Sequence, residues 1–133
     1  MFVTDTGISS RISYYMNSKE PQMFYTSNPL DQKIYQFMCG LYPNIKKTDI
    51  EIIPTDLTED NVFGWTLENN NQNEIEIHNN LSQKDYITTL IHELIHVDQN
   101  VRGLLDDTER EKEAYDNEER LTKLFCDKVW RFY

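Results

Sequence analysis

The feature that most constrains this chain is an apolar segment that carries two histidines and a glutamate in its interior. Ser82 is a typical helix N-cap and Gly103 a typical helix end, so we expect a helix from Ser82 to about Asn100. One face of that helix would pack on a sheet, and the other would present His92 and His96. The apolar face is formed by Tyr86, Ile87, Leu90, Ile91, Leu94 and Val97.

Residues 92–96 form a His-Glu-x-x-His motif on this predicted helix. Positions four apart lie on one face of a helix, so the two imidazoles can converge on one point. Neutral imidazoles suit Zn²⁺, and Glu93, about 100° further round the helix, would miss the ion but reach a water bound to it. The alternative is a surface helix whose histidines bind nothing. The apolar neighbours disfavour it, because buried polar groups need partners.

A catalytic zinc site needs a third protein ligand and an open fourth position. The one other histidine, His78, lies upstream, and the Gly and His of the metzincin continuation are absent, with Gln99 and Arg102 in place of ligands. The third ligand is therefore expected on the last predicted helix, from about Thr108 to Arg131. The carboxylates available there are Glu109, Glu111, Glu113, Glu118 and Glu119.

Periodicity favours Glu111 among these carboxylates. Glu111 and Glu118 lie on the apolar stripe of the helix and Glu113 lies opposite, and a carboxylate among apolar residues needs a partner such as a metal. Glu118 is expected to orient a histidine through its free N–H. Alternatively, Glu111 closes a capping box with Thr108, and Glu113 or Glu118 is the ligand. The stripe contains Ala114, Tyr115, Leu121, Phe125 and Val129.

The remaining elements are a helix and three strands. Asn28 and Pro29 are a typical helix start, and apolar residues continue at helical spacing towards Gly40. Strands are expected at residues 48–53, before Pro54, and at 62–67 and 74–78, with the last two forming a hairpin. In the third strand, Ile75 and Ile77 would face the core while Glu74, Glu76 and His78 face outward. These elements predict an α+β fold in a single domain spanning residues 1–133.

Composition excludes several classes of partner. The formal charge of −10, from 23 acidic and 13 basic residues, argues against binding to nucleic-acid phosphates or anionic membranes. No apolar run is long enough to span a bilayer, and the first residues do not resemble a signal peptide. Cys39 and Cys126 could pair but need not, since each suits a buried helix position. We therefore expect a cytoplasmic protein.

Two motifs together carry a family resemblance. Residues 92–99 read His-Glu-Leu-Ile-His-Val-Asp-Gln, and residues 111–118 read Glu-Lys-Glu-Ala-Tyr-Asp-Asn-Glu. This pair resembles gluzincin-type zinc metallopeptidases and looks closest to the small zincin-like proteins encoded by phages and bacteria. In that group a His-Glu-x-x-His-Val-x-Gln helix is followed by a Glu-x-Glu-Ala-Tyr-x-x-Glu helix. The match covers roughly residues 62–120 and says little about residues 1–60.

The resemblance implies a minimal zincin fold, in which a small, mostly antiparallel sheet packs against the motif helix and a C-terminal ligand helix. It implies that Glu111 is the third zinc ligand. It also implies that the strand before the motif helix is the sheet edge along which an extended peptide substrate lies, by strand addition. That strand comprises Glu74, Ile75, Glu76, Ile77 and His78.

The function that follows is zinc-dependent hydrolysis of peptide bonds, in which Glu93 takes a proton from a zinc-bound water and passes it to the leaving amine. Tyr115 and His78 are candidates for stabilising the charge of the intermediate. Their alternative roles are a core aromatic and an exposed residue at a strand end. A catalytically silent zinc-binding module that acts through a partner is the rival function, and a structural protein without metal is a second rival. The expected partner of the enzyme is a peptide or protein.

Overall fold

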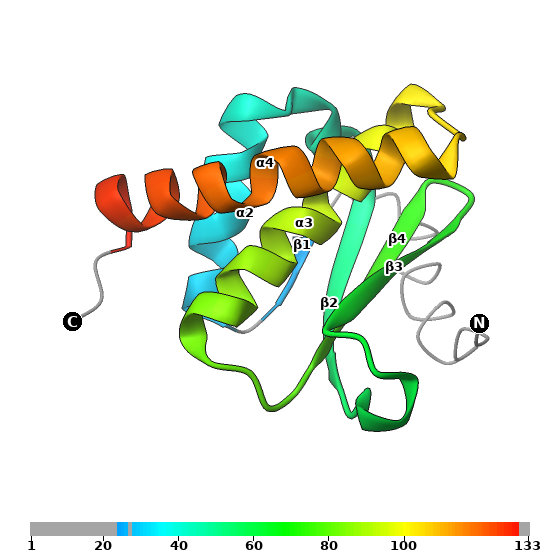
Figure 1. The fold of residues 1–133 in the computed structure, drawn as a ribbon. Coiled ribbons are helices and arrows are strands. Elements are labelled where there is room, and N and C mark those ends of the chain that lie inside the picture. Colours follow the sequence, from blue (N-terminus) through cyan, green and yellow to red (C-terminus); the bar gives the residue numbers. More distant parts are fainter. Residues whose placement is uncertain (1–23, 27, 131–133) are drawn as a thin grey trace.

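A computed structural model of the chain describes residues 24–26 and 28–130. Within these ranges a four-stranded sheet and three α-helices form an α+β fold, as the sequence predicted (Figure 1). No helix of the described ranges has both the length and the apolar character needed to cross a membrane. The elements, with η marking 3₁₀ turns, are β1 (Phe24–Tyr25), α2 (Pro29–Leu41), η1 (Pro43–Lys47), β2 (Asp49–Thr55), η2 (Thr58–Asp60), β3 (Gly64–Asn69), β4 (Gln72–His78), α3 (Gln83–Arg102) and α4 (Asp107–Lys128).

The sheet has the strand order β1-β2-β4-β3. β3 and β4 form the predicted antiparallel hairpin, but β2 pairs in parallel with both β4 and β1. The sheet is therefore mixed, and the expectation of a mostly antiparallel sheet was wrong. The physical reason is the path of the chain: after β2 it runs to the outer position of β3 and returns through β4, which enters between β2 and β3. β4 consequently runs in the same direction as β2.

A two-residue turn sets the register of the hairpin. Asn70 and Asn71 have φ angles of 50° and 65°, in the left-handed region. Asparagine tolerates this region better than most residues, and two consecutive left-handed residues match the twist of a tight hairpin. The turn pairs Asn69 with Gln72 and thereby places Thr66 opposite Ile75. β3 begins at Gly64, two residues later than the predicted start at residue 62.

The two faces of β4 differ less in solvent exposure than strict alternation of apolar and polar residues predicts. Ile75 and Ile77 are fully buried, as expected, and Glu76 and His78 are half-buried. Glu74, expected to face outward, has an exposed fraction of only 4%. β4 is an inner strand with a neighbour on each side, and Glu51 of β2 lies directly beside Glu74 in the register. Leu67 of β3 lies beside Glu74 on the other side, so side chains of both neighbouring strands flank Glu74 on its own face.

Helix α3 lies at the centre of the fold and contacts α2, η1, β3, β4 and α4. It begins as predicted, because the hydroxyl of Ser82 accepts the Asp85 N–H at 3.1 Å. It ends at Gly103, whose φ of 75° is readily adopted by glycine. Residues 89–99 are buried or nearly so. In the ribbon, α3 packs against the sheet on one side and against α4 on another (Figure 1).

Helix α4 runs antiparallel to α3. The hydroxyls of Thr88 and Thr122 lie 2.9 Å apart near one end, and Gln99 Nε2 donates to the Arg110 carbonyl at 2.9 Å near the other. Because α4 packs mainly on one helix, only a narrow stripe is covered. Tyr115 is therefore 64% exposed, and its assignment to the core stripe was wrong. Val129 is exposed too, whereas the buried residues of the expected stripe are Ala114, Leu121 and Phe125.

The start of α4 excludes the alternative role of Glu111. Asp106 is the N-cap, and its carboxylate accepts the Glu109 N–H at 2.9 Å. Thr108 thus lies inside the first turn, and no capping box forms between Thr108 and Glu111. The helix ends at Lys128, while the predicted end at Arg131 lies outside the described residues.

The two cysteines are both free and lie on different helices. Cys39 of α2 is buried and Cys126 of α4 is half-buried. Both lie on helices, as predicted, but only Cys39 is buried as expected of a small hydrophobic side chain.

Candidate metal centre

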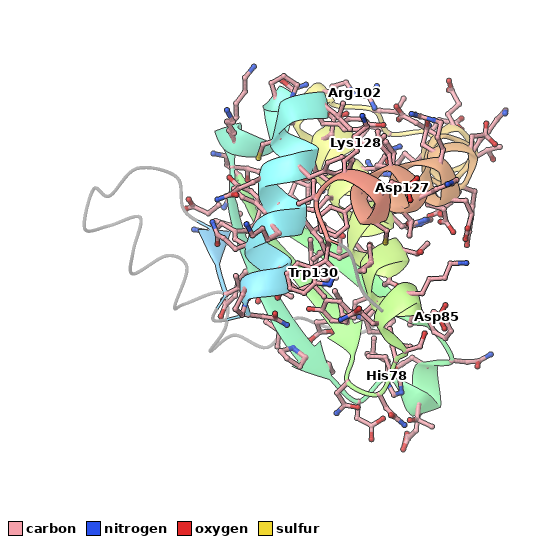
Figure 2. The ribbon with its side chains drawn as sticks, turned by 90° about the vertical axis from the view of Figure 1, so that its left-hand side faces the viewer. His78, Asp85, Arg102, Asp127, Lys128 and Trp130 are labelled. Carbon is pink, nitrogen blue, oxygen red and sulfur yellow. The ribbon has the colours of Figure 1, made fainter. Side chains whose placement is uncertain are left out.

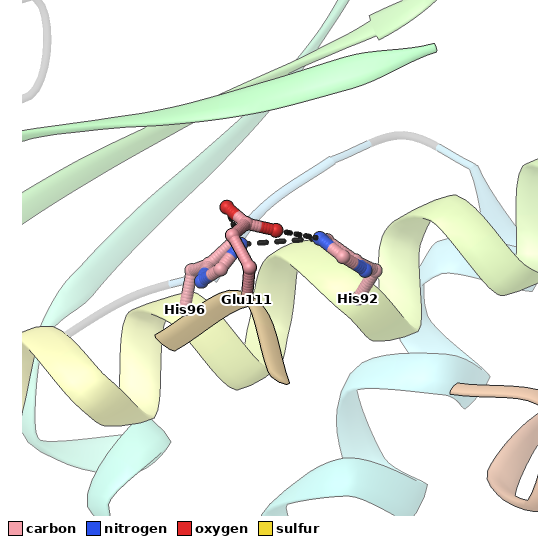
Figure 3. Close-up of side chains that lie close together, drawn as sticks. All are labelled: His92, His96 and Glu111. Atoms are coloured by element: carbon pink, nitrogen blue, oxygen red, sulfur yellow. Dashed lines mark hydrogen bonds and ion pairs between the residues drawn. The ribbon is translucent and has the colours of Figure 1, made fainter. Parts of the chain in front are cut away.

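His92 and His96 converge as their spacing on α3 predicts (Figure 3). Their Nε2 atoms lie 3.1 Å apart, and the ring centroids are separated by 4.7 Å. The exposed fractions of the two residues are 9% and 6%. The two side chains are therefore largely buried, and their Nε2 atoms face one point.

Glu111 extends from α4 towards the same point (Figure 3). Its Oε1 lies 3.2 Å from His92 Nε2, and its Oε2 lies 3.3 Å from His96 Nε2. The side chain is 53% exposed, so it is not buried among apolar residues as the stripe argument assumed. It is aimed at the imidazoles all the same. One ligand atom from each of the three residues fits within 4.8 Å of the others.

The Nδ1 atoms of the histidines are held by two different acceptors. His92 Nδ1 lies 2.6 Å from Glu118 Oε1, the contact expected of Glu118. His96 Nδ1 lies 2.7 Å from the side-chain oxygen of Gln99. A carboxylate or amide oxygen can only accept, so each Nδ1 must donate and carry its proton. In the neutral form, each Nε2 then has a free lone pair.

The convergence of these lone pairs is unfavourable without a cation. Two Nε2 atoms and two carboxylate oxygens face one another at 3.1–3.3 Å, all of them electron-pair donors. In a tetrahedral zinc site with bonds of about 2.0–2.2 Å, ligand atoms lie roughly 3.3–3.6 Å apart. The identity and spacing of these atoms thus fit a zinc ion, which accepts nitrogen and oxygen ligands of this kind.

Glu93, the next residue after His92, is 5% exposed. The Thr66 hydroxyl on β3 donates to Glu93 Oε1 at 2.7 Å. Burial raises the pKa of the Glu93 carboxyl above its usual value, although the two imidazoles and the Thr66 hydroxyl act in the opposite direction. A carboxylate with a raised pKa is a better proton acceptor near neutral pH than an exposed one.

An open pocket of about 730 Å³ brings these groups together. Its floor is the central part of α3, with His92, Glu93 and His96. Glu111 and Tyr115 line it from α4, and β3 with the segment before it forms the other wall. The candidate ligands and the candidate base therefore open on the same space.

The two residues considered for stabilising charge lie in very different places. Tyr115 lines the pocket, and its ring centroid lies 4.8 Å from that of His92 in an edge-on contact. His78 is not among the residues that line the pocket. Its Nδ1 accepts the Leu57 N–H at 3.0 Å, and in Figure 2 it lies at the opposite end of the view from Arg102. The structure therefore places His78 at the end of β4 and away from the pocket, which argues against its candidate role in stabilising charge.

The structure also corrects the expected substrate edge. β4, with Glu74, Ile75, Glu76 and Ile77, lies between β2 and β3, and its backbone pairs on both sides. An inner strand has no free backbone groups with which to pair another chain. Of the strands described, β3 is the edge nearest to the pocket. The expectation that β4 forms this edge was therefore wrong.

Three contacts of the site were not anticipated. Gln99 lies three residues after His96, a spacing that already indicates contact on a helix. Thr66 had no such local signal, because its contact with Glu93 requires β3 to dock on α3. Gly64 permits this docking: a Cβ there would lie 2.8 Å from the Thr89 methyl group. The third is Glu113, expected to lie opposite the stripe, which accepts from Gln99 Nε2 at 2.8 Å.

Comparisons of the chain with protein-family models, with curated proteins and with solved structures found no match. The gluzincin resemblance therefore remains a prediction, and the geometry of the pocket is the basis for a functional assignment.

Proposed function

We propose that this protein is a zinc-dependent metallopeptidase of the gluzincin type. His92, His96 and Glu111 would be the zinc ligands and Glu93 the general base. The observation that carries the proposal is the convergence of four electron-pair donors on one point, beside a buried carboxylate that opens on the same pocket. A purely structural metal site would have no need of that carboxylate.

The ligand set supports zinc in a catalytic role. Structural zinc sites are closed by four protein ligands, whereas catalytic sites have three and keep one position open. Two imidazoles and one carboxylate form such a set of three, and their open side is the pocket. A zinc ion held there would supply Lewis acidity towards the substrate carbonyl and the attacking water.

Glu93 would transfer the proton. Its Oε1 accepts the hydrogen bond from Thr66, which leaves Oε2 to take a proton from the attacking water and to deliver it to the leaving amine. Tyr115 is a candidate donor to the developing oxyanion, because its exposed ring stands on the pocket wall beside His92.

The substrate would be an extended segment of a peptide or protein. A peptide can pair with the edge strand β3 by strand addition, and this leads it past the floor of the pocket. Val62 and Phe63, just before β3, line the same pocket and are 36% and 53% exposed. They offer an apolar contact for a substrate side chain. We place the activity in a reducing cytosol, where the two free thiols would persist.

Zinc content and hydrolysis test the proposal together. Untagged protein should retain about one equivalent of zinc and cleave peptides of a quenched-fluorescence library. Glu93→Gln should lower the cleavage rate by about 10²–10⁴-fold, since proton transfer is lost, while the zinc content stays unchanged. Glu109→Gln, at an exposed position that does not line the pocket, is the matched control and should cleave normally.

Two results would contradict the proposal. Protein that holds well under one equivalent of zinc after supplementation has no metal centre at these residues. Protein that holds zinc but cleaves no library peptide is instead the silent zinc-binding module, acting through a partner.

A further inference from the structure

We propose that Gln99 is a positioning residue for His96: its buried amide, oriented by α4, keeps the imidazole proton on Nδ1 and leaves Nε2 free for the metal ion. The inference rests on the metal centre of the proposed function. It concerns the location of one proton, however, and this can be measured without a peptide substrate.

Gln99 lies on α3, one turn beyond His96, and is fully buried. Its Oε1 is 2.7 Å from His96 Nδ1. An amide has an oxygen that accepts and a nitrogen that donates, and the two are easily exchanged by a half-turn of the group. The surroundings of the nitrogen therefore decide which atom faces the imidazole.

Two acceptors from α4 determine the orientation of the amide. Gln99 Nε2 donates to the Arg110 carbonyl at 2.9 Å and to Glu113 Oε1 at 2.8 Å. With the amide reversed, its oxygen would face a carbonyl and a carboxylate at hydrogen-bond distance, and neither of these acceptors can donate to it. The nitrogen must then point to α4 and the oxygen to His96. Because that oxygen can only accept, His96 Nδ1 must carry the proton.

Glu113 is itself held in place by an ion pair. Its Oε1 accepts from Arg102 Nη2 at 2.6 Å, and Arg102 Nε donates to Asp98 at 2.8 Å. Arg102 cannot lose its charge near neutral pH, so the Glu113 carboxylate remains an acceptor for the Gln99 amide. The chain of contacts from Arg102 through Glu113 and Gln99 ends on a metal-ligand candidate.

The two ligand histidines thus have different partners but the same tautomer. Glu118 of α4 accepts directly from His92 Nδ1, whereas α4 acts on His96 through the neutral amide of Gln99. Partners of this kind orient an imidazole and increase its basicity towards a metal. His78 has the opposite arrangement, because its Nδ1 accepts the Leu57 N–H and so carries no proton. The chain therefore contains an internal control.

Nitrogen NMR of protein labelled at its three histidines tests the inference directly. Spectra are recorded at about pH 8, above the ordinary histidine pKa of about 6.5, without metal and after addition of zinc. We expect a proton on Nδ1 of His92 and of His96 in both states, and an unprotonated Nδ1 on His78. An unprotonated Nδ1 on His96 would overturn the inference, and the wild-type protein alone is sufficient for this measurement.

Zinc affinity of the variant Gln99→Leu provides the second test. Leucine has a similar size but cannot accept the Nδ1 proton, so we expect zinc affinity to fall by about 10–100-fold. Gln83→Leu is the matched control: it makes the same replacement at an exposed position of α3 that does not line the pocket, and should bind zinc normally. Unchanged zinc affinity in Gln99→Leu would refute the inference. If the wild-type protein bound no zinc, the proposed function would fail, while the metal-free spectrum would still decide the tautomer.

Discussion

Removal of the Glu111 carboxylate is the perturbation that bears most directly on the metal centre. Its side chain is 53% exposed and contacts the two imidazoles. Glu111→Ala should therefore change the stability of the metal-free protein by no more than about 0.5 kcal/mol, as is usual for surface substitutions. The effect should appear almost entirely as lost zinc affinity.

The size of that loss follows from the ligand set. Structural zinc sites with four ligands bind with about 10–16 kcal/mol, or roughly 2.5–4 kcal/mol for each ligand. Loss of one ligand should thus weaken zinc binding by about 10²–10³-fold. At free zinc of about 100 times the wild-type Kd, zinc stabilises the wild type by about 2.7 kcal/mol and a 100-fold weaker variant by about 0.4 kcal/mol.

The assay is thermal unfolding with and without zinc. For a chain of this size, about 1 kcal/mol corresponds to roughly 3–5 °C, so the zinc-induced rise in Tm should be about 7–11 °C smaller in Glu111→Ala than in the wild type. Glu109→Ala, at an exposed position outside the pocket on the same helix, should keep the full rise. A full rise in Glu111→Ala would refute the assignment of this carboxylate as a ligand.

Two further perturbations test other parts of the structure. Thr66→Val removes the hydrogen bond to Glu93 and should lower kcat at least about tenfold without changing zinc affinity, because a hydrogen bond to a charged group contributes about 1.5–3 kcal/mol. Thr66→Ser keeps the hydroxyl and should restore the rate. Normal turnover in the valine variant would contradict the role assigned to Thr66. Burial raises the pKa of Asp31 at the start of α2, although hydrogen bonds from Tyr86 and Thr26 oppose the shift. The folded state therefore holds this proton more tightly than the unfolded chain, and the contribution of Asp31 to stability should fall as pH rises through its folded pKa. Asp31→Asn should remove that slope from denaturant unfolding measured between about pH 3 and 7, and the reverse slope would contradict the argument.

The local parts of the site could be predicted because they depend on spacing within one element. His92 and His96 converge because they are four residues apart on a helix whose ends, Ser82 and Gly103, are determined by local chemistry. The hairpin between β3 and β4 was likewise expected from two successive strand segments, and Asn70 and Asn71 form its turn. Helix periodicity also selected Glu111 and Glu118, although it did not foresee that Glu111 is half exposed.

The predictions that were wrong concern the burial or the edge position of residues, which depend on the elements that pack beside them. Alternation predicted that Glu74 faces outward, but alternation cannot show that β4 enters between two other strands. The same strand order moves the substrate edge from β4 to β3. Tyr115 fits an apolar stripe at helical spacing, yet α4 covers too narrow a surface to bury it.

By itself, the sequence determined a helix with two imidazoles on one face and a glutamate beside them, because 3.6 residues complete each turn whatever surrounds the helix. Only the tertiary structure decided what completes the centre. The antiparallel docking of α4 brings Glu111 over the imidazoles and Glu118 against His92 Nδ1, and it orients the amide of Gln99 towards His96 Nδ1. The docking of β3 brings Thr66 to Glu93. These contacts join residues far apart in the chain or depend on a second element for their orientation, so they follow from the packing of the whole core.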